Sequence, residues 1–175
     1  MTEHVKQDSL RKHMLSVEAV MRAYAGKYSE DEELWGITGL LHDCDYEEFP
    51  DLKQHTQIAA DWLRSGGYDD RIIQAILAHN DANNLPRITP LEKGLYACDE
   101  ITGLVTAAAL VRPDKSIMNL ETASVRKKMK DKAFARGVNR EDIVRGAAEF
   151  GVDVDEHIAF VIAAMQSIAP NLGLQ

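Results

Sequence analysis

The sequence predicts an all-α protein, and three observations support this fold class. Apolar residues recur every three or four positions along most of the chain, which is the period of a helix with one buried face. Residues that start and stop helices stand at the ends of these segments. No segment alternates apolar and polar residues as a half-buried strand does.

The length of 175 residues suits a single domain with one core. We therefore expect one domain over residues 1–175, formed by about seven or eight helices that pack as a bundle. The main motifs fall within residues 10–111, and further helices within residues 115–170 complete the bundle.

The first two predicted helices are joined by a short polar segment. Residues 8–24 have apolar side chains at helical spacing, and His13 lies among them. The segment Ser29–Glu32 has the capping-box pattern, which predicts that a second helix starts there. That helix carries an apolar run that ends at His42-Asp43.

A loop and two shorter helices come next. Residues 44–53 contain a proline and several acids, which predicts an irregular loop. A helix over residues 55–64 starts near His55 and is closed by Gly66-Gly67. A further helix, which either Asp69 or Asp70 can cap, ends at His79.

The second half of the chain begins with a strong helix start. Thr89 can cap, Pro90 suits the first helical position and Glu92 completes a capping box. A long helix to about Val111 should follow, with Asp99 inside a nearly apolar surface. Capping and periodicity predict three more helices, over Thr122–Lys130, Asn139–Gly151 and Asp153–Ile168.

Composition limits the class of partner. The formal charge of −8 disfavours duplex nucleic acid, which is bound through a surplus of Lys and Arg. No apolar stretch is long enough to span a membrane, and no signal-peptide pattern opens the chain, so we expect a cytoplasmic protein with no membrane partner. Cys44 and Cys98 do not suggest a disulfide framework. The oligomeric state is left open.

Several metal-ligating residue types fall on different predicted helices or helix ends. All-helical proteins build interior metal sites in this way, with ligands from facing helices. Any one histidine at a helix end is more often a cap or a hydrogen-bonded boundary residue, and we interpret His4 and His157 in that way. The candidate ligands are His13, His42, Asp43, His55, His79 and Asp99.

Asp99 supplies an independent argument for a cation. A carboxylate among the apolar residues of a long helix is costly to bury without a partner. A metal ion is one such partner. An ion pair with Lys93 or a capping interaction with Thr102 is the alternative, although the spacing suits it less well.

The order of these residues resembles a known family. Leu-Leu-His-Asp at 40–43, His55, Ala-His-Asn at 78–80 and Ala-Cys-Asp-Glu-Ile-Thr-Gly at 97–103 are similar to the HD superfamily of metal-dependent phosphohydrolases, most closely to its small HDIG-type proteins. The resemblance covers roughly residues 10–111. It implies a divalent transition metal, Mn, Fe, Co, Ni or Zn, bound by His13, His42, Asp43 and Asp99.

Two positions in the resemblance leave the number of ions open. His55 and His79 match histidines that hold a second ion in some HD enzymes, with the aspartate of the HD pair as a bridge. In others, such histidines line the pocket around a single ion. One ion is therefore expected, and two are the alternative.

The resemblance implies hydrolysis of a phosphoester or phosphoanhydride in a small molecule, with a nucleotide as the expected substrate. His42 and Asp43 would be the catalytic pair, because the ion they hold polarises the phosphoryl oxygen and activates water. A regulatory or nucleotide-binding module without turnover is the alternative function.

The remaining polar residues are assigned by their chemistry. Asp45, Glu47 and Glu48 are interpreted as solvating the loop, although they are also candidate proton donors. Cys44 is interpreted as a small packed side chain, because hydrolytic sites of this type use nitrogen and oxygen ligands. Candidates for holding the substrate phosphate, each of which is otherwise a surface charge, are Arg112, Lys115, Arg136 and Arg140.

Overall fold

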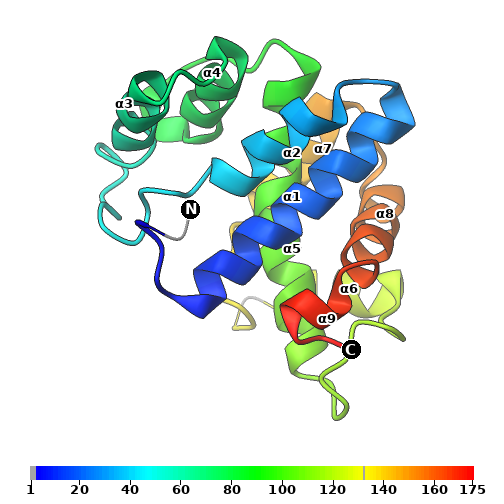
Figure 1. The fold of residues 1–175 in the computed structure, drawn as a ribbon. Helices are drawn as coiled ribbons and strands as arrows, with labels where there is room; N and C mark the ends of the chain where they lie inside the picture. The colour runs from blue at the N-terminus through cyan, green and yellow to red at the C-terminus, as the bar shows by residue number, and fades with distance from the viewer. Residues whose placement is uncertain (1–2, 132) are drawn as a thin grey trace. The chain divides into compact units, whose positions relative to one another are not determined.

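The computed structural model describes residues 3–131 and 133–175, and every regular element in these ranges is helical (Figure 1). This confirms the all-α fold class. The described residues form nine α-helices, one more than the upper end of the expected range, because a short C-terminal helix was not anticipated. The elements are α1 (Asp8–Tyr28), α2 (Glu32–Leu41), α3 (Gln57–Ser65), α4 (Asp70–His79), η1 (Asp81–Asn83), α5 (Pro90–Leu110), α6 (Thr122–Met129), α7 (Arg140–Phe150), α8 (Val154–Gln166) and α9 (Ala169–Leu172).

The contacts divide the chain into two compact units, Met1–Tyr96 and Ala97–Gln175. The boundary falls within α5, so its first turns belong to the first unit and the rest to the second. The single domain predicted over residues 1–175 stays a prediction.

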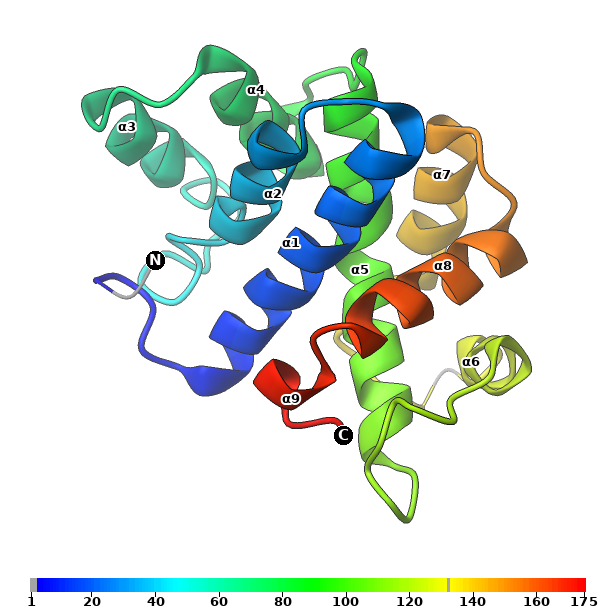
Figure 2. The same ribbon diagram turned by 45° about the vertical axis from the view of Figure 1, so that its right-hand side comes forward.

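Helices α1 and α2 lie side by side in the first unit (Figures 1 and 2). Two glycines on α2 allow this close approach. A Cβ atom on Gly39 would lie 2.9 Å from the backbone nitrogen of Glu18, and one on Gly36 would meet the side chain of Arg22 at 2.3 Å. The missing side chains let the two backbones pack closely, which holds the end of α2 against the face of α1 that carries His13.

Helices α3 and α4 form a second pair in the same unit. Asp69 caps α4, as predicted, by accepting from the N–H of Arg71 at 2.8 Å. The buried face of α4 includes Ile72 and Ile76, and the helix ends at His79. Since α4 also contacts α2, the ends of these two helices bring their terminal histidines together.

The helix start predicted at Ser29 is wrong. Ser29 instead ends α1 in the left-handed conformation, with φ of 58°. Asp31 caps α2, because its carboxylate accepts from the N–H groups of Glu33 and Leu34, each at 3.0 Å. A residue that closes one helix in this conformation cannot also supply the extended backbone of the next N-cap.

The capping box predicted at the start of α5 is confirmed. The hydroxyl of Thr89 accepts from the N–H of Glu92 at 3.3 Å, and the carboxylate of Glu92 accepts from the N–H of Thr89 at 2.9 Å. The first turn of α5 is therefore held by reciprocal bonds between neighbours in the sequence.

In the second unit, α8 contacts both α6 and α7 (Figure 2). Asn139 caps α7 and Asp153 caps α8, as predicted. The buried His157 on α8 donates from Nε2 to the carbonyl oxygen of Ala97 at 2.8 Å. This histidine is a hydrogen-bonded core residue, in agreement with its exclusion from the ligand set.

Within the described residues, no helix has the length and apolar content required to cross a membrane.

Candidate metal centre

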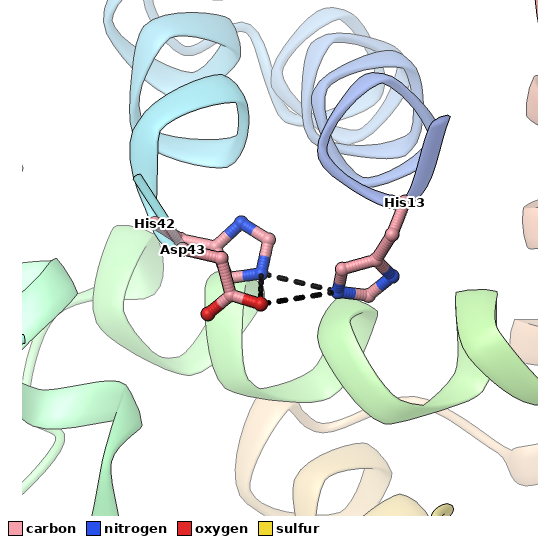
Figure 3. Close-up of side chains that lie close together, drawn as sticks. All are labelled: His13, His42 and Asp43. Atoms are coloured by element: carbon pink, nitrogen blue, oxygen red, sulfur yellow. Dashed lines mark hydrogen bonds and ion pairs between the residues drawn. The ribbon is translucent and has the colours of Figure 1, made fainter. Parts of the chain in front are cut away.

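Three of the predicted ligands meet where α2 ends against α1. His42 and Asp43 follow the last turn of α2, and His13 projects from α1 toward them (Figure 3). The Nε2 atoms of His13 and His42 lie 3.2 Å apart. They lie 3.8 Å and 3.5 Å, respectively, from Oδ2 of Asp43. Two imidazole nitrogens and one carboxylate oxygen therefore converge on one point.

A backbone carbonyl sets the orientation of the His42 ring. Its Nδ1 lies 2.8 Å from the carbonyl oxygen of Gly39, which can only accept, so Nδ1 carries the proton and donates it. The neutral ring then has its lone pair on Nε2, the atom that faces His13 and Asp43. A metal-ligating histidine is commonly oriented by such a bond from its other nitrogen.

The other oxygen of Asp43 faces a second pair of histidines. Nε2 of His55 lies 3.3 Å from Oδ1 of Asp43, and Nε2 of His79 lies 3.7 Å from the same oxygen. Nδ1 of His79 donates to the carbonyl oxygen of Ile76 at 2.7 Å, so its Nε2 also carries the lone pair. Asp43 thus presents one carboxylate oxygen to each of two histidine pairs.

The structure contains two groups in the first unit that could hold an ion. One is formed by His13, His42 and Asp43, and the other by Asp43, His55 and His79. Within each group the ligand atoms all lie within 4.8 Å of one another. We call these groups the His13–His42 position and the His55–His79 position.

Asp45 is the site residue that the sequence interpretation missed. It was expected to solvate the loop, but it is fully buried. Its Oδ1 accepts from Nδ1 of His55 at 2.8 Å, and its Oδ2 accepts from the N–H groups of Thr56 and Ala59 at 2.8 Å and 2.9 Å. Asp45 therefore orients the His55 ring and caps α3 at the same time. No local signal distinguishes it from the other acids of the loop.

The residue next to His55 has a strained backbone. Thr56 has φ of 70°, which is unusual for a β-branched residue. Its N–H donates to Asp45, and its hydroxyl accepts from the side-chain amide of Asn83 at 2.7 Å. Such strain costs about 1–3 kcal/mol and persists where surrounding bonds enforce it. Here those bonds hold the chain where His55 enters the site.

Asp43 is held in its ionised form. Burial by itself would raise the pKa of this carboxyl. When the His42 and His79 rings also carry a proton on Nε2, the charge of His42 and the hydrogen bonds from both rings outweigh burial and hold the pKa well below its usual range. A carboxylate with this pKa is an oxygen ligand at neutral pH and does not act as a proton donor.

The neighbouring polar residues of the loop have structural partners. Glu47 accepts from the N–H groups of Lys6 and Gln7 at 2.8 Å and 2.9 Å, and Glu48 lies 3.1 Å from Nδ1 of His4. Burial, followed by the charge of Asp45, raises the pKa of the Cys44 thiol to about 12. A buried thiol that keeps its proton does not supply a thiolate ligand.

Asp99 and the predicted phosphate-binding residues belong to the second unit, and their roles stay predictions. The hydroxyl of Thr102 donates to the backbone carbonyl of Asp99 at 2.7 Å. The guanidinium of Arg112 pairs with Asp114 at 3.1 Å. Lys115 has a positive φ of 51° in the loop that follows α5.

Two further phosphate candidates lie near the start of α7. Arg136 and Arg140 line a hollow of about 660 Å³. The guanidinium of Arg140 donates to the backbone carbonyls of Ala135, Val138 and Phe134, which ties it to its own loop.

The family model described as HD domain matches residues 10–104. This range is more than half of the chain, and it contains all six candidate ligands. Comparison with curated proteins and comparison with solved structures gave no match.

Proposed function

The chain belongs to the HD-domain family of metal-dependent phosphohydrolases, and from this premise we propose that it hydrolyses a phosphoester or phosphoanhydride of a small molecule, with a nucleotide as the substrate. The observation that carries the proposal is the arrangement around Asp43. One carboxylate oxygen faces His13 and His42, and the other faces His55 and His79.

The residues fit divalent transition ions by their donor chemistry. Imidazole nitrogen suits Fe, Ni and Zn, and carboxylate oxygen also suits Mn. The rings of His42, His55 and His79 each donate from Nδ1, which leaves the Nε2 lone pair directed to Asp43. Lone pairs gathered around a carboxylate repel one another, and a cation relieves that repulsion. The donor set therefore supports a metal centre of Mn, Fe, Co, Ni or Zn.

We propose two ions for each chain, with Asp43 as the ligand that they share. His13 and His42 would hold one of them, and His55 and His79 the other. The buried bond from His55 to Asp45 supports the second ion, because a carboxylate that orients a histidine is typical of a metal ligand. Asp99 remains the proposed additional ligand from the second unit.

The ions would supply Lewis-acid chemistry, by polarising a phosphoryl oxygen and lowering the pKa of water. The protein residues position the reacting groups. Asp43 stays ionised and offers both oxygens, while the backbone carbonyls of Gly39 and Ile76 keep the rings of His42 and His79 in one orientation. This preorganisation lowers the reorganisation needed during reaction.

Metal analysis combined with a hydrolysis assay tests the proposal. We expect purified, reconstituted protein to hold two ions for each chain and to release phosphate from members of a nucleotide panel. His79→Ala should reduce the metal content from two ions to one. His4→Ala is the matched control, because His4 stacks on Trp62 outside the site and its loss should leave the metal content unchanged.

The outcomes separate the competing functions. Protein that binds no divalent ion under any loading condition would refute the metal centre. Protein that keeps its ions but releases phosphate from no substrate would favour the regulatory or nucleotide-binding module. If the wild type holds one ion and His79→Ala still holds one ion, the metal site is restricted to the His13–His42 position.

A further inference from the structure

A surface hollow of about 450 Å³ adjoins the metal centre at His13. The first turns of α1 contribute Ser9 and Leu10 to it, and the loop after Asp43 contributes Tyr46, Glu47 and Pro50. All of these residues belong to the first unit. The His13 side chain is 22% exposed and forms part of the hollow's wall, while its Nε2 faces Oδ2 of Asp43. The hollow and the metal centre therefore share one side chain.

The size of the hollow restricts what it can hold. Pockets for small molecules have volumes of about 300–1,000 Å³, and this one lies in the lower part of that range. It can accommodate a group the size of a nucleoside, but it is too small for a folded partner.

The charge of the hollow argues against additional phosphates. Among its lining residues in the described part of the chain there is no lysine or arginine, and Glu47 supplies the only carboxylate. Bonds from the N–H groups of Gln7 and Lys6 hold the pKa of Glu47 below its usual range, so this carboxylate is negative at neutral pH. The charges of Arg11 and Lys6 also lower the pKa of Glu47, but neither residue lines the hollow. The lining itself therefore offers a diphosphate or triphosphate tail a carboxylate and no cation with which to pair. The group that it accepts should be uncharged.

The surfaces that line the hollow suit an uncharged group with an aromatic ring. Tyr46 is 40% exposed, and the Tyr46 and His55 rings pack in a T-shaped arrangement, with 4.9 Å between the ring centres. Leu10 and Pro50 add apolar surface, and Ser9 adds a hydroxyl group. An exposed aromatic face beside a few polar atoms can stack on a base and bond a sugar hydroxyl.

We propose that this hollow binds the uncharged leaving group of a phosphate monoester, a nucleoside in size and chemistry, while the phosphate lies at the metal centre. This assignment rests on the proposed hydrolase function. Water adds its oxygen to phosphorus and the bond from phosphorus to the ester oxygen breaks. The products are inorganic phosphate and the nucleoside, which takes up one proton from water. The substrate class is thus a nucleoside monophosphate.

Steady-state kinetics on the metal-reconstituted full chain test the assignment. The wild type should have a higher kcat/KM for nucleoside monophosphates than for the corresponding triphosphates. Ser9→Trp fills the hollow from an exposed helix position, so it should raise KM for the monophosphate by about tenfold with little change in kcat. Metal content and the hydrolysis of glycerol phosphate, whose leaving group is small, should stay unchanged. Ser65→Trp, at the end of α3 and away from the hollow, is the matched control.

A second variant tests the role of charge. Glu47→Gln keeps the shape and the acceptor oxygen but removes the negative charge. It should raise kcat/KM for triphosphates relative to monophosphates by about threefold or more, at low ionic strength. An unchanged ratio would overturn the argument that Glu47 excludes a longer phosphate chain.

Binding without turnover separates this proposal from the hydrolase function. Calorimetry should detect adenosine or uridine binding to the metal-loaded protein, with about tenfold weaker binding to Ser9→Trp. If nucleosides bind in this way but no ester is hydrolysed, the hydrolase function is refuted and the assignment of the hollow as a nucleoside site is retained. If monophosphates are hydrolysed but Ser9→Trp has a wild-type KM, or triphosphates are preferred, the hollow assignment fails and the hydrolase function stands.

Discussion

The two carboxylate oxygens of Asp43 each face a pair of histidines, and the two pairs differ in how exposed their rings are. At the His13–His42 position, one ring is completely buried and the other is 22% exposed. At the His55–His79 position, both rings are buried, with exposures of 5% and 4%. The first position therefore has access to solvent and to the adjoining hollow, whereas the second is enclosed.

The two positions also differ in what holds their ligands. The first depends on the packing of α1 against α2, which Gly39 allows. A backbone carbonyl orients one ring in each position, that of Gly39 for His42 and that of Ile76 for His79. The second position differs because the buried Asp45 carboxylate orients its other ring, His55. Close helix packing thus positions the histidines on one side of Asp43, and a buried carboxylate orients a histidine on the other side. Four substitutions test this difference.

Asp43→Ala should abolish both positions, because each uses one oxygen of this carboxylate. We expect the metal content to fall from two ions to none and the hydrolytic activity to fall below about 1% of the wild-type value. Elemental analysis and phosphate release measure the two effects. Asp61→Ala removes an exposed carboxylate paired with Arg64 and should change neither. Unchanged metal content in Asp43→Ala would refute the assignment of the centre.

Asp45→Asn should weaken only the His55–His79 position. The amide retains one acceptor oxygen but turns an NH₂ group toward the donors that now bond the carboxylate. Loss of such a supporting partner typically costs about 10–100-fold in metal affinity. Titration with metal should show one weakened ion and one unchanged ion.

The retained ion also serves as a control for folding in Asp45→Asn. If the variant had simply lost its structure, both ions would be lost together. Glu47→Gln changes another acid of the same loop and should leave both affinities unchanged. Equal weakening of the two ions by Asp45→Asn would show that the positions are not independently supported.

Gly39→Ala should weaken the His13–His42 position by displacing a helix. The new Cβ would lie 2.9 Å from the backbone nitrogen of Glu18, so α2 must move away from α1. Overpacking costs about 1–3 kcal/mol, and the better helix propensity of alanine returns about 1 kcal/mol. Chemical unfolding should therefore show a net loss of about 1 kcal/mol, with a lower metal affinity at this position.

Gly36→Ala is the matched control for the same interface. Its Cβ would meet the flexible side chain of Arg22, which can move more easily than a backbone can. We expect a smaller loss of stability and an unchanged metal affinity. If the two alanine variants behaved alike, the backbone contact at Gly39 would not be what positions His42.

Cys44→Ala should have the smallest effect, because the buried Cys44 thiol keeps its proton and so offers no thiolate ligand to either metal position. Burial and the charge of Asp45 raise its pKa to about 12, so it stays protonated at neutral pH. The metal content should remain at two ions, and the native wild-type thiol should react with a thiol reagent only after unfolding. Loss of one ion from Cys44→Ala would instead identify the sulfur as a ligand.

The sequence predicted the parts of this protein that depend on neighbours along the chain. The capping box at Thr89 and Glu92 and the caps at Asp69 and Asn139 were all recognisable, because their partners lie within three residues. The helix start predicted at Ser29 was wrong because a serine that lies before one helix can also end the preceding helix.

The metal ligands were predictable as a set of residue types, because histidines at helix ends follow apolar faces that must pack together. The residue pattern was thus enough to predict the helical fold class and the candidate ligands. It could not predict which oxygen of Asp43 faces which pair, or that Asp45 is buried against His55 while Glu47 is not. These contacts join segments far apart in the chain, so their geometry depends on how closely the helices pack.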